Sequence, residues 1–354
     1  MTEAMNDLLE KIRKQGRLTD GDLAGQDLSG VDWSGMVFER VNLKGANLAR
    51  ANLTETVFLD SDLSRANLKE AEATSSRWLR VGLTGADLSR ARLTNDEFEK
   101  ADLTEADLSG AEATRASFSE CNLGGARFIE TRCFRTEFFQ SRLAGTNFTG
   151  ADLTRVMASG ADLTQVIFNR TNLTKAFLKG ANLNGQTFPG CLLNKTILTE
   201  ASLVGINLAG FDLTQINFAG AEVSESHFSG ATGRYVNFSR AKAQGADFSG
   251  SSLYMSLFDG ADLQSARFKQ ARLIQSVLIR ANCAKTDFSG ADLQYSNFSH
   301  AKISQTDFSR AHFDLTKMHG VILDQARWSG SNMEGIVRTD PDLAEAEAWR
   351  PPEQ

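Results

Sequence analysis

The sequence predicts an all-β protein, a parallel β-helix in which each coil has four short sides. The first observation is a five-residue unit, A-(D/N)-L-x-x, which occurs twice in succession in residues 46–55, ANLARANLTE. An apolar residue, usually a large one, occupies almost every fifth position from Leu18 to Met333, with no insertion or deletion in the series. This period matches neither the 3.6-residue period of a helix nor the two-residue period of a flat strand.

Each unit is most simply one short extended side followed by one turn, because its frequent Gly, Ser, Asn and Asp residues favour turns. In this arrangement the large central residue points inward, together with the small residue two positions before it, such as Ala46 or Ala66. The position between them is usually Asp or Asn, and the last two positions face solvent.

The number of units per coil follows from the aromatic residues. Between residues 28 and 118, the central residues whose numbers end in eight alternate between Leu and an aromatic residue. The aromatic set is Phe38, Phe58, Trp78, Phe98 and Phe118. A period of twenty residues indicates four units per coil, so residues n and n+20 should stack. From Phe128 onward Phe takes over the Leu column, which keeps the interior volume nearly constant, as a close-packed core requires.

With these repeats the sequence resembles the pentapeptide-repeat family over about nine-tenths of its length. The resemblance implies a right-handed quadrilateral β-helix. At four pentapeptides per coil this chain would form about 16 coils, and we expect short helices at both ends. Gly233 leaves one central position without a side chain, and we expect the loosest coil there.

Three segments are expected. Residues 1–16 should form an N-terminal capping helix that ends at Gly16 and carries a set of apolar residues. This helix could also dock a partner. The apolar set is Met5, Leu8, Leu9 and Ile12. Residues 17–337 should form the β-helix.

Residues 338–354 should form a C-terminal helical cap or tail. Asp340-Pro341 is a helix-start signal, and Leu343 and Trp349 are expected to cover the last coil. Many members of the family dimerise through this end, so the resemblance also implies a homodimer through the C-terminal end.

Composition excludes several classes of protein. The chain has 354 residues and a formal net charge of −6, which does not indicate direct nucleic-acid binding. It has no apolar run long enough for a membrane span, and we expect no signal peptide. The four cysteines fall at inward repeat positions, so we expect buried thiols and a cytoplasmic location. They are Cys121, Cys133, Cys191 and Cys283.

No catalytic, cofactor-binding or metal-binding constellation is apparent, so we do not expect an enzyme. His300 and His319 should be neighbours on adjacent coils, and we interpret them as surface residues. The carboxylates lie at the solvent-facing repeat position without a cleft that could shift their pKa values for catalysis.

One wall of the predicted solenoid carries apolar residues at positions that are polar elsewhere. We expect them to form an exposed apolar stripe that binds a protein partner. The candidate partner-binding residues are Val37, Val57, Leu59, Leu79, Phe139, Met157, Phe177, Ile197, Leu257, Val277 and Ile279.

The favoured function is a non-catalytic scaffold or adaptor that docks a protein, whose identity the sequence does not give, on this wall or through its ends. The family resemblance implies a bacterial protein, and accessory proteins of type VI secretion are one role known in the family. The alternative implied by the family is a DNA mimic that binds DNA gyrase and confers quinolone resistance. Such a mimic needs dense negative charge, whereas one column here alternates Asp20, Arg40, Asp60 and Arg80.

Overall fold

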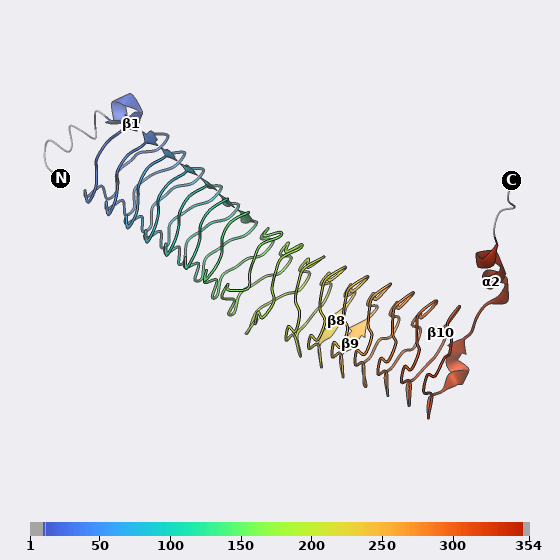
Figure 1. Cartoon of the computed structure of the whole chain (residues 1–354). Helices are drawn as coiled ribbons and strands as arrows, with labels where there is room; N and C mark the ends of the chain where they lie inside the picture. The colour runs from blue at the N-terminus through green and yellow to red at the C-terminus, as the bar shows by residue number, and fades with distance from the viewer. Residues whose placement is uncertain (1–9, 11, 350–354) are drawn as a thin grey trace, which may run out of the picture. The chain divides into compact units, whose positions relative to one another are not determined.

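The computed structural model describes residue 10 and residues 12–349, which form a parallel β-solenoid of about 16 turns. The chain divides into two compact units. Unit 1 contains residues up to 182 together with 186–193, and unit 2 contains residues 183–185 together with those from 194 onward. Within each unit the chain winds in stacked turns (Figure 1).

Short strands mark one wall of unit 1 and parts of unit 2. Unit 1 has β1 (Arg17–Thr19), β2 (Val37–Glu39), β3 (Val57–Leu59), β4 (Arg77–Leu79), β5 (Glu97–Glu99), β6 (Ser117–Ser119) and β7 (Glu137–Phe139). Unit 2 has β8 (Thr232–Arg234), β9 (Ser252–Tyr254), β10 (Thr316–Lys317), the 3-10 helix η1 (Met333–Gly335), β11 (Ile336–Val337) and α2 (Pro341–Ala348).

The strand register confirms four pentapeptides per coil. Phe38 pairs with Phe58 and Phe58 with Trp78, each in parallel and twenty residues apart. Isolated parallel bridges keep the same register on the other walls, as between Asp22 and Asn42. Residues n and n+20 are therefore neighbours throughout each unit.

The register also accounts for the Asp or Asn of each unit. The Asp62 carboxylate accepts a hydrogen bond from the Ser64 N–H at 2.8 Å, which closes the turn that follows. The Asn67 side chain donates to the Asn47 side-chain oxygen on the adjacent coil at 3.0 Å. These short polar side chains thus join each side to its own turn and to the next coil.

The aromatic columns predicted from the sequence form the core of unit 1. Ring centroids are 5.1 Å apart between Phe38 and Phe58, and 4.7 Å apart between Phe58 and Trp78, with nearly parallel planes. Where the second column begins, Phe128 meets Phe118 edge to face at 5.7 Å and 81°. Both arrangements are favourable for aromatic pairs.

The expectation of a loose coil at Gly233 is wrong. Gly233 lies in β8 and pairs with Leu253, and its backbone packs closely against its neighbours. A Cβ atom at this position would lie 2.8 Å from Val236 Cγ2 and 3.2 Å from the Leu213 carbonyl carbon. Neighbouring atoms therefore already occupy the space that a side chain at position 233 would enter.

The termini agree with the prediction in part. Residues 12–15 are helical and Ile12 is buried, whereas Met5, Leu8 and Leu9 lie outside the described residues. Helix α2 begins at Pro341, and the Asp340 carboxylate accepts hydrogen bonds from the N–H groups of Asp342 and Leu343.

Helix α2 does not bury its apolar side chains as expected. Leu343 is 47% exposed and Trp349, just after the helix, is 68% exposed. No residue of α2 itself is buried. Near the end of unit 2, an open apolar cavity of about 230 Å³ is lined by Met318, Val321, Leu323, Met333, Ile336, Arg338 and Thr339. Leu343 and Trp349 are not among its lining residues.

Asp96 occupies an inward position that usually holds a small residue, and its side chain is fully buried. It accepts hydrogen bonds from the Ser76 N–H and from the Trp78 indole N–H, both at 3.1 Å. Burial raises the pKa of Asp96 well above its ordinary value, because these two bonds only partly offset the loss of solvation.

We expect the Asp96 carboxyl to make stability depend on pH. Between the unfolded pKa, about 3.9, and the raised folded pKa, the native state keeps a proton that the unfolded chain releases. The free energy of unfolding should therefore fall as pH rises, by up to about 1.4 kcal/mol per pH unit. Urea unfolding of wild type and Asp96→Asn from about pH 4 to about pH 8 measures the difference. Parallel pH profiles would contradict the expectation.

A central position without a side chain, as the sequence suggests at Gly233, would gain stability from a larger residue. The close packing in the structure predicts a loss of stability instead. We expect Gly233→Ala to destabilise unit 2 by about 1–3 kcal/mol, because the added methyl group overpacks the site. Thermal unfolding followed by circular dichroism measures the change. A rise in melting temperature would show that the position is an unfilled centre after all.

Candidate functional site

The predicted apolar stripe is interrupted in the structure. In unit 1 the bridged column runs from Arg17 to Val37 and Val57 and ends with Met157 and Phe177. Between these two pairs it passes through Arg77, Glu97, Ser117 and Glu137. The wall of unit 1 therefore carries two separate apolar patches.

The two patches differ in exposure. Val37, Val57, Leu59 and Leu79 are half-buried. The second patch consists of Met157 and Phe177 together with Phe139 at the end of β7. It is more exposed, with Phe139 at 58%, Met157 at 40% and Phe177 at 38%.

The column in unit 2 is interrupted as well. Ile197 is bridged to Asn217, which is followed by Asn237, Leu257 and Val277. Leu257 is exposed, whereas Ile197, Val277 and Ile279 are half-buried. The stripe is therefore interrupted, because the fixed twenty-residue register places polar residues between the apolar ones, and partner binding on this wall stays a prediction.

Exposed apolar side chains are also not confined to this wall. Ile322 is 78% exposed, Leu315 59% and Leu192 54%, and all three lie outside the predicted set. Exposure alone therefore does not mark the wall as a binding surface.

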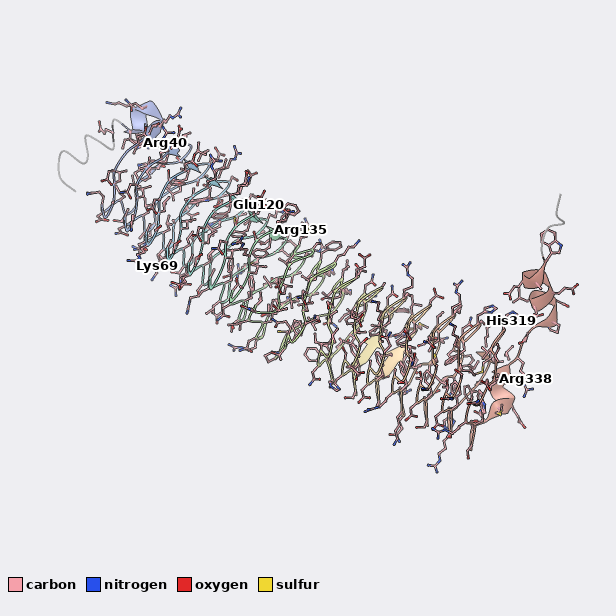
Figure 2. The ribbon with its side chains drawn as sticks, in the orientation of Figure 1. Arg40, Lys69, Glu120, Arg135, His319 and Arg338 are labelled. Carbon is pink, nitrogen blue, oxygen red and sulfur yellow. The ribbon has the colours of Figure 1, made fainter. Side chains whose placement is uncertain are left out.

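A row of like charges beside the second patch distinguishes it. Arg115, Arg135, Arg155 and Lys175 occupy successive coils at one corner, with a spacing of about 4.8 Å. All four side chains are exposed. Among the described residues, none of these four forms an ion pair. We call this row the basic ladder, and Figure 2 labels its member Arg135.

Other corner columns pair opposite charges. Arg40 contacts Asp20 at 2.7 Å and Arg80 contacts Asp60 at 2.6 Å. Each pair joins adjacent coils, as the alternating signs in the sequence predict. The basic ladder is an exception, since neighbouring cations at this spacing repel one another.

The basic ladder and the second apolar patch share an open groove. This basic groove has a volume of about 550 Å³ and is lined by Arg115, Arg135, Glu137, Arg155, Met157, Lys175 and Phe177. The Arg135 guanidinium carbon also lies 5.4 Å from the ring centre of Phe134, within cation–π range. The groove therefore offers positive charge and apolar surface together.

The cysteines do not provide reactive groups. All four are buried, as predicted. Burial raises the pKa of the Cys121 thiol to about 11, and that of Cys133 and Cys283 well above the ordinary range. These thiols stay protonated near neutral pH, so they are poor nucleophiles and poor metal ligands.

The sequence analysis missed the basic ladder and part of a histidine cluster. A comparison of the solvent-facing sequence positions at intervals of twenty residues would have found the basic ladder. His300 and His319 are neighbours as predicted, with ring centroids 5.2 Å apart, and both contact Glu347 of α2. Glu347 lies outside the repeat, so no register argument could place it there. The interpretation of both histidines as surface residues is wrong for His319, which is buried between its coil and the chain that leads to α2.

Comparison with known proteins identifies the repeat. The family model for pentapeptide repeats matches residues 17–54, 42–77, 61–95, 97–132, 131–170, 176–215, 212–250, 256–294 and 292–330. The chain belongs to the pentapeptide-repeat family. No curated protein matches the sequence.

Several solved structures of pentapeptide-repeat type are similar to this member of the family. A trypsin-treated form of QnrB1, a plasmid-mediated fluoroquinolone resistance protein, is 21% identical, with 50% of this chain and 88% of that chain covered and a TM-score of 0.27. HetL from Nostoc sp. strain PCC 7120, involved in heterocyst differentiation regulation, is 19% identical, with coverage of 85% and 91% and a TM-score of 0.17. Rfr23 from Cyanothece 51142 is 20% identical, with coverage of 42% and 93% and a TM-score of 0.22.

Within the described part of this pentapeptide-repeat protein, no helix combines the length and the apolar character needed to cross a membrane.

We expect the basic ladder to reduce stability at low ionic strength. Arg135→Gln removes repulsion from Arg115 and Arg155, and should raise the free energy of unfolding by about 0.5 kcal/mol. The gain should disappear near 1 M salt, where the Debye length is about 3 Å. Arg80→Gln is the matched control, since it removes an attractive pair and should lower stability by a similar amount. Equal effects of the two variants would contradict this electrostatic account.

Proposed function

We propose that the protein is a non-catalytic scaffold that binds another protein in the basic groove of unit 1. The observation that carries the proposal is the basic ladder, four cations that form no ion pair with any described residue and lie beside the exposed side chains of Met157 and Phe177. Repulsion within the ladder is relieved when an anionic ligand binds, so the ladder favours a partner of opposite charge.

The partner chemistry follows from the groove. Its cations favour a segment with several Asp or Glu residues, and its apolar floor favours large apolar side chains between them. An extended segment suits an open groove that runs across successive coils. Val37, Val57, Leu59 and Leu79 form a second, weaker candidate surface, as do Ile197, Leu257, Val277 and Ile279 in unit 2, because most of these side chains are half-buried.

The wider setting is also a proposal. The family resemblance supports a bacterial, cytoplasmic adaptor, with accessory roles in type VI secretion as one example. The apolar cavity near the end of unit 2 and the 78% exposure of Ile322 support a homodimer through the C-terminal end. The alternating ion pairs weigh against the DNA-mimic alternative, because paired charges cancel the field that a DNA mimic requires.

A peptide-display selection on the full-length protein tests the proposal. We expect enrichment of peptides that combine Asp or Glu with large apolar residues. Binding of a selected peptide should weaken more than tenfold in Arg135→Glu/Arg155→Glu and in Met157→Asp/Phe177→Asp. It should also weaken as ionic strength rises.

Two comparisons make the test specific. Arg65→Glu/Arg170→Glu reverses two exposed cations outside the groove and should leave the affinity unchanged. Selection of peptides without acidic residues, or equal losses in all three double variants, would refute the proposal. Tighter binding of a single-stranded oligonucleotide at the same residues would replace the protein partner with a nucleic acid.

A further inference from the structure

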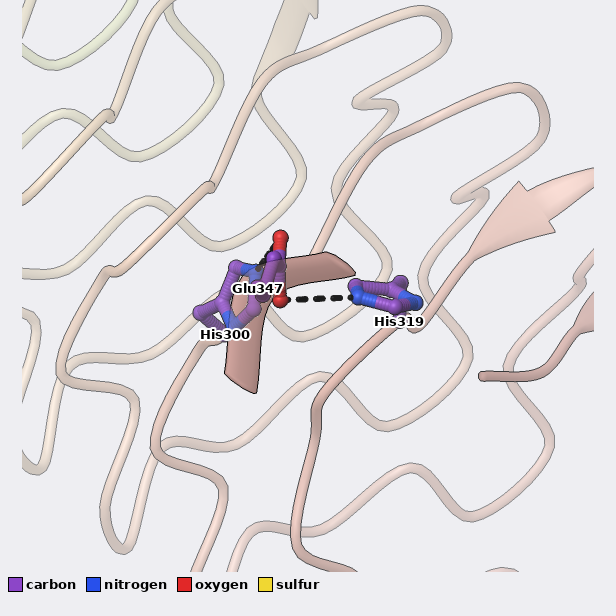
Figure 3. A group of neighbouring side chains, drawn as sticks. All are labelled: His300, His319 and Glu347. Atoms are coloured by element: carbon purple, nitrogen blue, oxygen red, sulfur yellow. Dashed lines mark hydrogen bonds and ion pairs between the residues drawn. The ribbon is translucent and has the colours of Figure 1, made fainter. Parts of the chain in front are cut away.

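Three potential metal ligands meet where α2 approaches the solenoid of unit 2. His300 and His319 come from successive coils, and Glu347 comes from the last turn of α2 (Figure 3). The Glu347 carboxylate places one oxygen 3.3 Å from His300 Nε2 and the other 3.2 Å from His319 Nε2. The three ligand atoms all lie within 4.8 Å of one another.

These distances suit a small tetrahedral metal ion. Zinc binds imidazole nitrogen and carboxylate oxygen at about 2.0–2.2 Å, which puts neighbouring ligand atoms about 3.3–3.5 Å apart. Each histidine nitrogen already lies at nearly this separation from one Glu347 oxygen, although the two histidines face different oxygens of the carboxylate. Two His and one Glu are a ligand set that zinc uses with a water molecule in the fourth position.

The surroundings hold the ligands in place. The His319 side chain is only 9% exposed. The His300 ring lies over Gly320 of the next coil, where a Cβ atom would come within 2.5 Å of His300 Nδ1. The glycine at position 320 therefore leaves room for this ring.

We propose that His300, His319 and Glu347 form a zinc site that fastens α2 to the solenoid. No residue of α2 is buried, so the helix depends on polar contacts for its attachment. Besides the bonds to Glu347 and Asp340, the Gly320 N–H donates to the Thr339 hydroxyl at 3.2 Å. A metal shared by the helix and two coils would join elements that otherwise meet through these hydrogen bonds.

Zinc binding changes the hydrogen bonds in a defined way. In the metal-free arrangement His319 Nδ1 accepts a hydrogen bond, so the proton of the neutral ring resides on Nε2 and points to Glu347. Coordination through Nε2 moves this proton to Nδ1. The Asp340 N–H then loses its acceptor, while Glu347 remains attached through the metal.

Equilibrium dialysis of tag-free, chelator-treated full-length protein against Zn²⁺ tests the site. We expect one zinc ion per chain and a loss of affinity of more than tenfold in His300→Ala and in Glu347→Gln. His312→Ala should bind zinc as the wild type does, because this exposed histidine lies outside the cluster. Gly320→Ala should weaken binding by displacing the His300 ring. No bound zinc, or equal affinities in all variants, would overturn the proposal.

Hydrogen exchange tests the fastening role separately. With zinc, the amides of residues 344–348 should exchange more slowly, and the Asp340 amide should exchange faster because it has lost its acceptor. Both effects should be absent in Glu347→Gln. Zinc binding without slower exchange in α2 would show that the metal does not fasten the helix.

Discussion

The parallel register between residues n and n+20 is the constraint on which the rest of the structure depends. The sides of one coil form hydrogen bonds with the equivalent sides of the next coil. The neighbours of residue n along its column are therefore residues n−20 and n+20. The register sets the aromatic stack through Phe38, Phe58 and Trp78, and also the side-chain bond from Asn67 to Asn47. Stability in such a repeat comes mainly from contacts between neighbouring coils.

This constraint makes the solvent-facing surface a set of columns. A column is stable where adjacent charges alternate, as in the pairs Asp20–Arg40 and Asp60–Arg80. The basic ladder departs from this rule over four successive coils, and the register gives its cations no opposite charge within the column. A solenoid with a filled core has no deep cleft, so a binding site has to be built from such columns, corners or ends.

The twenty-residue register does not determine the contacts at the end of unit 2. Beyond the repeat, α2 meets the coils through side chains that the register does not control, namely Asp340 and Glu347 with His319 and His300. The hydrogen bonds and ion pairs just named link α2 to the coils, and its apolar Leu343 is 47% exposed. The attachment of this helix therefore depends on electrostatics and ligand chemistry more than on apolar burial.

The sequence by itself determined the fold, because the five-residue period, the twenty-residue aromatic alternation and the Asp or Asn positions are local patterns repeated many times. It also determined the buried cysteines, the start of α2 at Pro341 and the position of His300 next to His319 on adjacent coils. Only the tertiary structure decided that Gly233 is closely packed, since the approach of Val236 and Leu213 to this position cannot be read from a missing side chain. The approach of Glu347 to the two histidines was likewise decided by the path of the chain after the last repeat. No periodic rule governs that path.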